Sequence, residues 1–150
     1  MNNRVFLLED DEGVAAIAKL LEIKFGYQVD RARDLVDTVW YLEETNTKYL
    51  ALLLDVAVKG EEFIDNKGNQ RVFDDRIGMN GFEYYRQERE GILTQYKGRI
   101  GFYSAFTESI KSIAKKECIS IDECMLFDKC NRNLSSAIHD WLKKLEDNIV

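Results

Sequence analysis

The sequence predicts an α/β fold in which a parallel sheet of five strands is covered by helices on both faces. Five short apolar segments alternate along the chain with five segments whose apolar residues recur at helical spacing. One strand segment, residues 50–54, is apolar throughout, as expected of a strand that is buried on both faces of a parallel sheet. Because parallel neighbours need right-handed crossovers, and each crossover here is a helix, we expect a doubly wound three-layer α/β/α sandwich.

The first half of the chain contains three strands and two helices. The strand segments are residues 4–8, residues 27–31, where the pattern is weaker, and residues 50–54. From Val14 the apolar residues fall at helical spacing as far as Gly26, a natural C-terminal cap. Asp34 is a suitable N-cap for a second helix, which we expect to run through Leu42 and to fray in the turn residues 45–47.

The second half begins with an interruption and then resumes the alternation. Residues 59–77 place the apolar pairs 63–64 and 72–73 on either side of a polar turn at 65–69, which predicts a β-hairpin inserted after the third strand. The expected elements that follow are a helix at 81–90, a strand at 99–104, a helix from Thr107 to about Glu117, a strand at 124–128 and an amphipathic helix capped by Asn131 or Asn133.

The length and composition of the chain predict a single domain spanning residues 1–150. The chain is 45% hydrophobic and 32% charged, with a formal net charge of −6. The acidic balance and the lack of a dense run of Lys and Arg argue against nucleic-acid binding. No apolar stretch approaches the ~18 residues of a membrane span, and no signal peptide is visible, so we expect a cytoplasmic protein without membrane contact.

Polar side chains follow four of the predicted strands at the ends where ligands collect in parallel sheets. Glu9 and Asp10 follow the first strand, Asp55 ends the third, Ser104 ends the fourth and Lys129 follows the fifth. The strand order 2-1-3-4-5 of flavodoxin-like sheets makes strands one and three neighbours at the switch point. In that order Glu9, Asp10 and Asp55 come to lie side by side, and the other two side chains converge on them.

Clustered carboxylates need a cation, because two unit charges ~4 Å apart cost about 4 kcal/mol at an effective dielectric near 20. An all-oxygen ligand set without Cys or His suits Mg²⁺, which also takes a phosphate oxygen. Such a metal beside an ionised Asp and a Lys is typical of phosphoryl transfer, in which the protein mainly positions groups and neutralises charge. The sequence therefore predicts Asp55 as a nucleophile that becomes an aspartyl phosphate.

Taken together, these motifs resemble those of response-regulator receiver domains, the CheY-like superfamily of two-component signalling. The resemblance covers the chain apart from the insertion, and its motifs come in the family's order. They are the acidic pair Glu9-Asp10, Asp55, the sequence GMNGFE at 78–83, Ser104 with Ala105, and Lys129.

The resemblance implies that Asp55 accepts a phosphoryl group from a phosphohistidine of a histidine kinase or phosphotransfer protein. It also implies that Asp10, Asp55 and the backbone carbonyl of Ala57 bind Mg²⁺, and that Glu9 assists through water. Ser104 and Lys129 would contact the phosphoryl oxygens. Each of these residues also has a simpler explanation when taken alone, such as capping of a helix by Asp10 or Ser104.

We therefore expect a stand-alone receiver that switches contacts with an unknown protein target in a phosphorelay. The output face would be formed by helix four, strand five and helix five, and the protein would have at most self-phosphorylation and self-dephosphorylation activity. The oligomeric state is open, a homodimer included. Two alternatives are an interaction module that works without phosphorylation and a phosphatase of the haloacid-dehalogenase type. The phosphatase would want a second acid at the position of Ala57.

Two residues near Lys129 depart from the family's pattern. Receivers usually follow this Lys with a cis Pro, and here Cys130 follows. A non-proline cis bond costs ~3 kcal/mol, so we expect a trans peptide and a different aim for Lys129. Leu126 occupies the position of the aromatic switch residue, which argues against the usual coupling through a ring that turns inward. Alternation places the neighbouring Tyr103 and Phe127 on other faces.

The insertion at 59–77 is the most distinctive feature of the chain. Because it emerges directly after Asp55, we expect it beside the mouth of the site. There it could screen the site from water, contact the kinase or mediate self-association. A tolerated surface insertion without such a role is an equally good interpretation, since loops accept extra residues at little cost.

Overall fold

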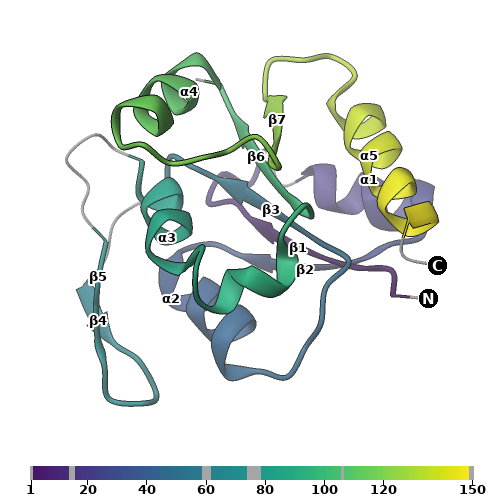
Figure 1. The fold of residues 1–150 in the computed structure, drawn as a ribbon. Coiled ribbons are helices and arrows are strands. Elements are labelled where there is room, and N and C mark those ends of the chain that lie inside the picture. The colour runs from purple at the N-terminus through teal and green to yellow at the C-terminus, as the bar shows by residue number, and fades with distance from the viewer. Residues whose placement is uncertain (1, 14–15, 59–61, 74–78, 106, 149–150) are drawn as a thin grey trace.

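A five-stranded parallel sheet forms the centre of the protein (Figure 1). The computed structural model describes residues 2–13, 16–58, 62–73, 79–105 and 107–148. The strands are β1 (Arg4–Leu8), β2 (Gln28–Ala32), β3 (Ala51–Asp55), β6 (Ile100–Ser104) and β7 (Met125–Asp128), and their order is β2-β1-β3-β6-β7. Counted along this sheet, that is the predicted order 2-1-3-4-5, so the predicted fold class is confirmed. Val14, at the expected start of the first helix, lies outside the described residues.

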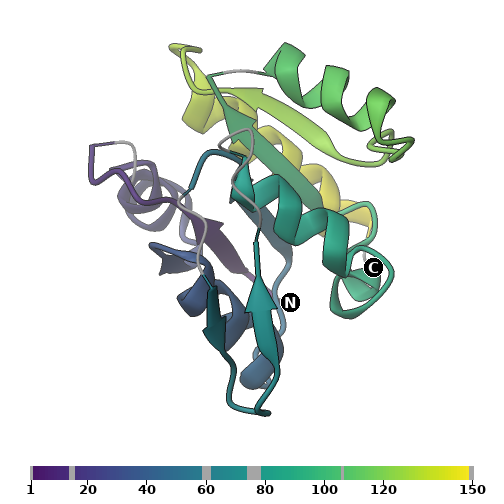
Figure 2. The same ribbon diagram turned by 90° about the vertical axis from the view of Figure 1, so that its left-hand side faces the viewer.

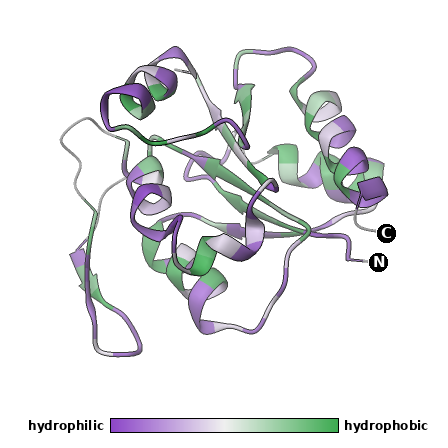
Figure 3. Ribbon diagram, viewed as in Figure 1, coloured by the Kyte–Doolittle hydropathy of each residue, from purple (hydrophilic) through white to green (hydrophobic). Residues whose placement is uncertain are grey.

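Helices cover both faces of the sheet and give it two separate cores. One face is covered by α1 (Ala16–Phe25) and α5 (Leu134–Asn148). The other face is covered by α2 (Leu35–Val39), which continues into the π-helical turn η1 (Trp40–Glu44), together with α3 (Asn80–Glu88) and α4 (Thr107–Lys116). A 3-10 helix, η2 (Ile92–Tyr96), which the sequence pattern did not predict, connects α3 to β6. Figure 3 shows the hydrophobic residues concentrated on the strands and the inner faces of the helices.

The sequence pattern places the ends of several elements correctly. Gly26 has a φ of +79° and donates its NH to the Glu22 carbonyl, as a C-terminal cap does. The Asp34 side chain accepts from the NH of Asp37 at 2.8 Å and caps α2. All five residues of β3 are buried, in agreement with a central strand. No helix of the described part of the chain is both long and apolar enough to cross a membrane.

The predicted hairpin is present, with β4 (Glu62–Ile64) antiparallel to β5 (Gln70–Val72). Residues 59–61 and 74–77 of the expected insertion lie outside the described residues. Figures 1 and 2 show the hairpin beside α2 and α3. Its described strands make hydrogen bonds with the end of η1 and with the second half of α3. The expected position beside the mouth of the site is therefore wrong for these strands, because Arg71 and Phe73 find their partners on the α2–α3 face.

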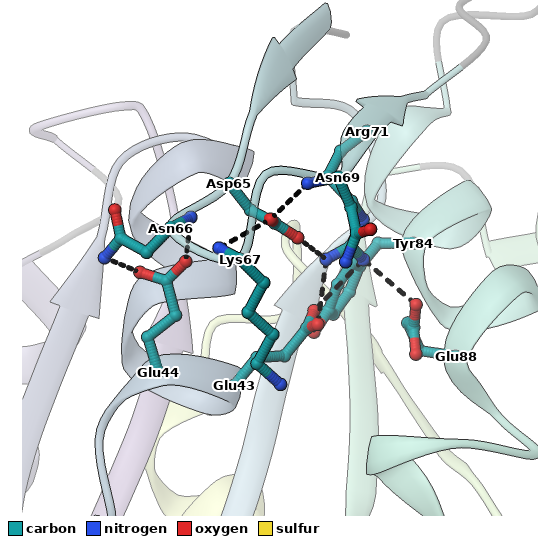
Figure 4. A network of polar contacts seen from close by, with 9 residues as sticks. All are labelled: Glu43, Glu44, Asp65, Asn66, Lys67, Asn69, Arg71, Tyr84 and Glu88. Atoms are coloured by element: carbon teal, nitrogen blue, oxygen red, sulfur yellow. Dashed lines mark hydrogen bonds and ion pairs between the residues drawn. The ribbon is translucent and has the colours of Figure 1, made fainter.

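Arg71 is the centre of the contacts that hold the hairpin (Figure 4). Its side chain is 10% exposed and makes two contacts with Glu43, at 2.8 and 3.1 Å. It also contacts Glu88 at 2.9 Å and Asp65 at 3.5 Å, and the hydroxyl of Tyr84 donates to Glu43 at 2.7 Å. The Arg71 guanidinium thus binds the hairpin to the helices, because it pairs with carboxylates of η1, α3 and the hairpin itself.

Candidate functional site

The register of the sheet brings the strand ends to a common edge. The strand pairs align Leu8 with Leu54, Asp55 with Tyr103, and Ser104 with Asp128. Pairing continues one residue further, since the NH of Glu9 donates to the Ala32 carbonyl at 2.9 Å and the NH of Lys129 donates to the Ser104 carbonyl at 3.0 Å. Glu9 and Asp55 therefore leave the sheet side by side, and Lys129 leaves the same edge two strands away, beyond Ser104.

Lys129 contacts both buried carboxylates. Its Nζ lies 2.7 Å from Asp55 Oδ2 and 3.2 Å from Glu9 Oε2. Burial lowers the pKa of Lys129, but its hydrogen bond with Asp55 and the charges of Asp55 and Glu9 raise that pKa by more, so the net shift is upward. The ammonium stays charged and offsets the negative charge of the cluster.

Glu9 is fully buried, and its two oxygens differ in their partners. Oε2 accepts from the hydroxyl of Tyr103 at 2.6 Å and from Lys129, whereas Oε1 is buried without a hydrogen-bond partner among the described residues. Burial is the main cause that raises the pKa of Glu9 to about 7, and the neighbouring Asp55 adds to the shift. The hydrogen bond from Tyr103 and the charge of Lys129 oppose it.

The three predicted acidic residues form a group that fits a divalent cation. Glu9, Asp10 and Asp55 each offer a carboxylate oxygen, and these oxygens lie within 4.8 Å of one another. Asp10 is exposed, so a cation there keeps access to water. An all-oxygen set is what Mg²⁺ prefers, and Oε1 of Glu9 has no hydrogen-bond partner among the described residues. The residues therefore fit the predicted metal.

The loop after Asp55 is held by the start of α3. The NH of Ala57 donates to Asp55 Oδ1 at 2.9 Å, and the NH of Gly81 donates to the Val56 carbonyl at 3.1 Å. A Cβ at Gly81 would lie 1.9 Å from the Asp55 carbonyl oxygen, so only glycine permits this close approach. The motif at 78–83 thus fixes the Asp55 loop. Its first residue, Gly78, lies outside the described part of the chain.

The remaining predicted site residues lie at the same edge. Ser104 is the last residue of β6 and is buried, and Ala57 is an exposed residue of the Asp55 loop. The roles assigned to Ser104 in phosphoryl binding and to the Ala57 carbonyl in metal binding stay predictions.

The departures near Lys129 have different outcomes. The described residues contain no cis peptide, so the expected trans bond before Cys130 is confirmed. The expected change in the aim of Lys129 is wrong, because its long side chain reaches Asp55 from a trans loop. Leu126 packs against the core under α2, α3 and α4, whereas Tyr103 and Phe127 belong to the core under α1 and α5. The predicted alternation is confirmed.

Two residues of the site were missed by the sequence analysis. Arg31, on β2, donates through Nε to the carbonyl of Glu9 at 2.9 Å and pairs through Nη1 with Glu12 at 3.0 Å. Tyr103 packs on the α1–α5 face, yet its hydroxyl reaches the Glu9 carboxylate. Alternation predicts the face of a strand residue but not the reach of a tyrosine hydroxyl along that face, so no spacing could reveal this contact.

Solved structures match this chain, whereas no protein-family model and no curated protein does. A CheY-like response regulator receiver domain protein from Methanospirillum hungatei JF-1 has a TM-score of 0.63 at 15% identity, with 99% of each chain covered. A sensor protein from Polaromonas sp. JS666 has a TM-score of 0.64 at 14% identity, with 100% of each covered. Response regulator TrrA from Thermotoga maritima, in complex with Mg²⁺-BeF, has a TM-score of 0.60 at 15% identity, with 97% of this chain and 99% of that one covered. The resemblance found in the sequence is thus confirmed at the level of the fold.

Proposed function

We propose that this chain, which has the fold of receiver domains, accepts a phosphoryl group on Asp55 in a Mg²⁺-dependent reaction. The donor would be a phosphohistidine of a histidine kinase or phosphotransfer protein. The observation that carries the proposal is the contact of Lys129 Nζ with Asp55 at 2.7 Å, beside the carboxylates of Glu9 and Asp10. The likeness to TrrA, whose structure contains Mg²⁺-BeF, supports it.

The residues of the site can carry out each part of this transfer. An oxygen of Asp55 forms the new bond to phosphorus while the bond from phosphorus to the imidazole nitrogen breaks, and the imidazole keeps the electron pair and takes up a proton. Lys129 remains protonated and neutralises the oxygens of the transferred group, with Ser104 as a further hydrogen-bond donor. Glu9, Asp10, Asp55 and the Ala57 carbonyl would hold Mg²⁺, which supplies charge neutralisation when bound.

The position of Ala57 separates this proposal from a phosphatase. A haloacid-dehalogenase-type enzyme would want an acid there to protonate its leaving group, and the methyl group of Ala57 has no proton to give. We therefore expect stoichiometric phosphorylation without rapid turnover. Steady release of p-nitrophenol from p-nitrophenyl phosphate would contradict this expectation.

Intact mass spectrometry tests the phosphoacceptor directly. We expect the protein, incubated with Mg²⁺ and an acyl phosphate, to gain one phosphoryl group, and we expect Asp55→Ala to gain none. Asp140→Ala, which removes an exposed carboxylate on α5, serves as the matched control and should gain the group as the unchanged protein does. The absence of any gain in the unchanged protein, or an equal gain in Asp55→Ala, would refute the proposal.

Signal output would pass through the face formed by α4, β7 and α5. Ser104 and Lys129, which would contact the phosphoryl group, border this face: Ser104 is the last residue of β6, three residues before α4 begins, and Lys129 directly follows β7. Phosphorylation can shift this surface only by contacts that differ between its two states. We expect amide hydrogen exchange to change mainly in residues 107–116 and 125–148 after phosphorylation. A change confined to α1 and β2 would contradict this assignment.

A further inference from the structure

We propose that Tyr103 is a positioning residue of this site, whose hydroxyl holds one oxygen of Glu9 and so leaves the other oxygen to the divalent cation. This inference rests on the proposed function, because it concerns the same metal. It adds a residue that does not contact the reacting atoms and acts through Glu9 and Lys129.

The hydrogen bond between Tyr103 and Glu9 is short and fully buried. The hydroxyl lies 2.6 Å from Glu9 Oε2 and 3.2 Å from the Leu8 carbonyl oxygen, and both side chains are 0% exposed. A phenol has one proton to donate, and the shorter distance assigns it to the carboxylate. Because both side chains are buried from solvent, water does not compete for this hydrogen bond, and the Glu9 carboxylate is held in one orientation.

In that orientation the two Glu9 oxygens differ in their hydrogen-bond partners. Oε2 already accepts from Tyr103 and from Lys129 Nζ at 3.2 Å, whereas Oε1 is buried with no hydrogen-bond partner in the part of the chain that the structure describes. A buried oxygen without a partner is costly, and a cation or its bound water would relieve that cost. Because Oε2 is engaged, Oε1 is the atom that Glu9 can offer to a cation.

The ring of Tyr103 also contacts the cation that Lys129 carries. Lys129 Nζ lies 4.8 Å from the centre of the ring, within the range of a cation–π contact. The ring itself is fixed in the core under α1 and α5, and its strand neighbours are Asp55 on one side and Phe127 on the other. One rigid side chain therefore contacts both Glu9 and Lys129.

Removal of the hydroxyl alone should weaken Mg²⁺ binding. Tyr103→Phe keeps the ring, its packing and its contact with Lys129, but it removes the shorter of the two hydrogen bonds that hold Oε2 of Glu9 and leaves only the one from Lys129 at 3.2 Å. Partners that orient metal ligands change metal affinity by roughly 10-fold to 100-fold when removed, and we expect Tyr103→Phe to weaken Mg²⁺ binding by about 10-fold or more. Tyr84→Phe is the matched control, since Tyr84 is also fully buried and donates to a carboxylate, Glu43, at 2.7 Å.

Titration with Mg²⁺ alone, followed by calorimetry and by NMR of protein carrying ¹³Cζ-tyrosine, tests the inference. The Tyr103 resonance is the one that Tyr103→Phe lacks, and we expect it to move saturably with Mg²⁺ in the unchanged protein. We expect Tyr84→Phe to bind Mg²⁺ as the unchanged protein does. If none of the tyrosine ¹³Cζ resonances of the unchanged protein moved with Mg²⁺, a result that needs no variant, the inference would be overturned. Wild-type Mg²⁺ affinity in Tyr103→Phe would overturn it too.

The outcomes also separate this inference from the proposed function. Phosphorylation of Asp55 with unchanged Mg²⁺ affinity in Tyr103→Phe would overturn the positioning role and leave the phosphoacceptor standing. A protein that binds no Mg²⁺ and gains no phosphoryl group would overturn both.

Discussion

Replacement of Arg71 by Met should release the hairpin from the helices. The Arg71 side chain is 10% exposed and faces Glu43 at 2.8 Å and Glu88 at 2.9 Å. Breaking a buried ion pair by removing one partner costs ~3–5 kcal/mol. Without Arg71, the carboxylates of Glu43 and Glu88 lose their shared partner. Because their side chains are 15% and 23% exposed, water partly solvates these charges, and the lower value of about 3 kcal/mol applies.

The assay must separate loss of the hairpin from loss of the whole fold. The hairpin can detach while the sheet persists, and the cost to global unfolding is limited to the free energy of docking. We expect Arg71→Met to lower the melting temperature by up to roughly 6–12 °C. We also expect limited proteolysis within residues 62–72 to accelerate by about two orders of magnitude, because cleavage follows the population of the open form.

Two further variants control for the charge and for the arginine itself. Arg71→Lys keeps the positive charge but loses the paired contact with Glu43. Its melting temperature and its rate of proteolysis should therefore lie between those of the unchanged protein and those of Arg71→Met. Arg89→Met removes an arginine that pairs at 3.6 Å with the exposed Glu90, and such a pair contributes ~1 kcal/mol or less. Proteolysis of Arg71→Met at the rate of the unchanged protein, or an equal effect of Arg89→Met, would refute the anchoring role of Arg71.

Further substitutions and a change of pH also have defined outcomes. Gly81→Ala should destabilise the protein by roughly 2–4 kcal/mol in urea unfolding, since its Cβ would strike the Asp55 carbonyl and no flexible side chain can yield. In calorimetry, Mg²⁺ affinity should rise with pH as far as about 7 and then level off, because below that pKa the cation must displace the proton of Glu9. The metal-free protein should lose stability as the pH rises from 4.5, the ordinary pKa of Glu, to about 7, the pKa of Glu9 in the folded protein. Over this range the unfolded chain has already released the Glu9 proton, whereas the folded protein still holds it. Asp34→Ala should cost about 1 kcal/mol in the same unfolding assay through loss of the α2 cap, and Asp37→Ala, which leaves the capping carboxylate in place, should cost less.

The sheet and the carboxylates of the site could be predicted because both depend on local patterns. The fully apolar segment at 50–54 identifies the central strand, and a carboxylate at its end can only emerge at the edge where parallel strands finish. Topology then brings Glu9 next to Asp55 without any knowledge of side-chain conformation. Alternation was sufficient to separate Leu126 from Phe127.

The contacts that were missed depend on partners far apart in the sequence. Arg71 pairs with Glu43, which is 28 residues away, and with Glu88, which is 17 residues away, and no spacing rule connects these segments. The bond from Tyr103 to Glu9 spans 94 residues and depends on the length of one side chain. The aim of Lys129 was misjudged for a similar reason, since a flexible side chain reaches its partner whether or not the next peptide is cis.

The two faces of the hairpin have different environments, since one face packs against the helices and the other is exposed to solvent. Phe63 and Arg71, which are paired across the strands, face the helices, whereas Ile64 and Val72 are 73% and 50% exposed. The side chains of Ile64 and Val72 take no part in the anchoring contacts, since position 72 contributes only its backbone carbonyl, which accepts from Gln87 Nε2 at 2.9 Å. These two side chains can therefore be exchanged without loosening the strands. A fluorophore attached at position 64 would therefore sit on anchored strands and report on binding events at this surface, without contact to the proposed phosphoacceptor site.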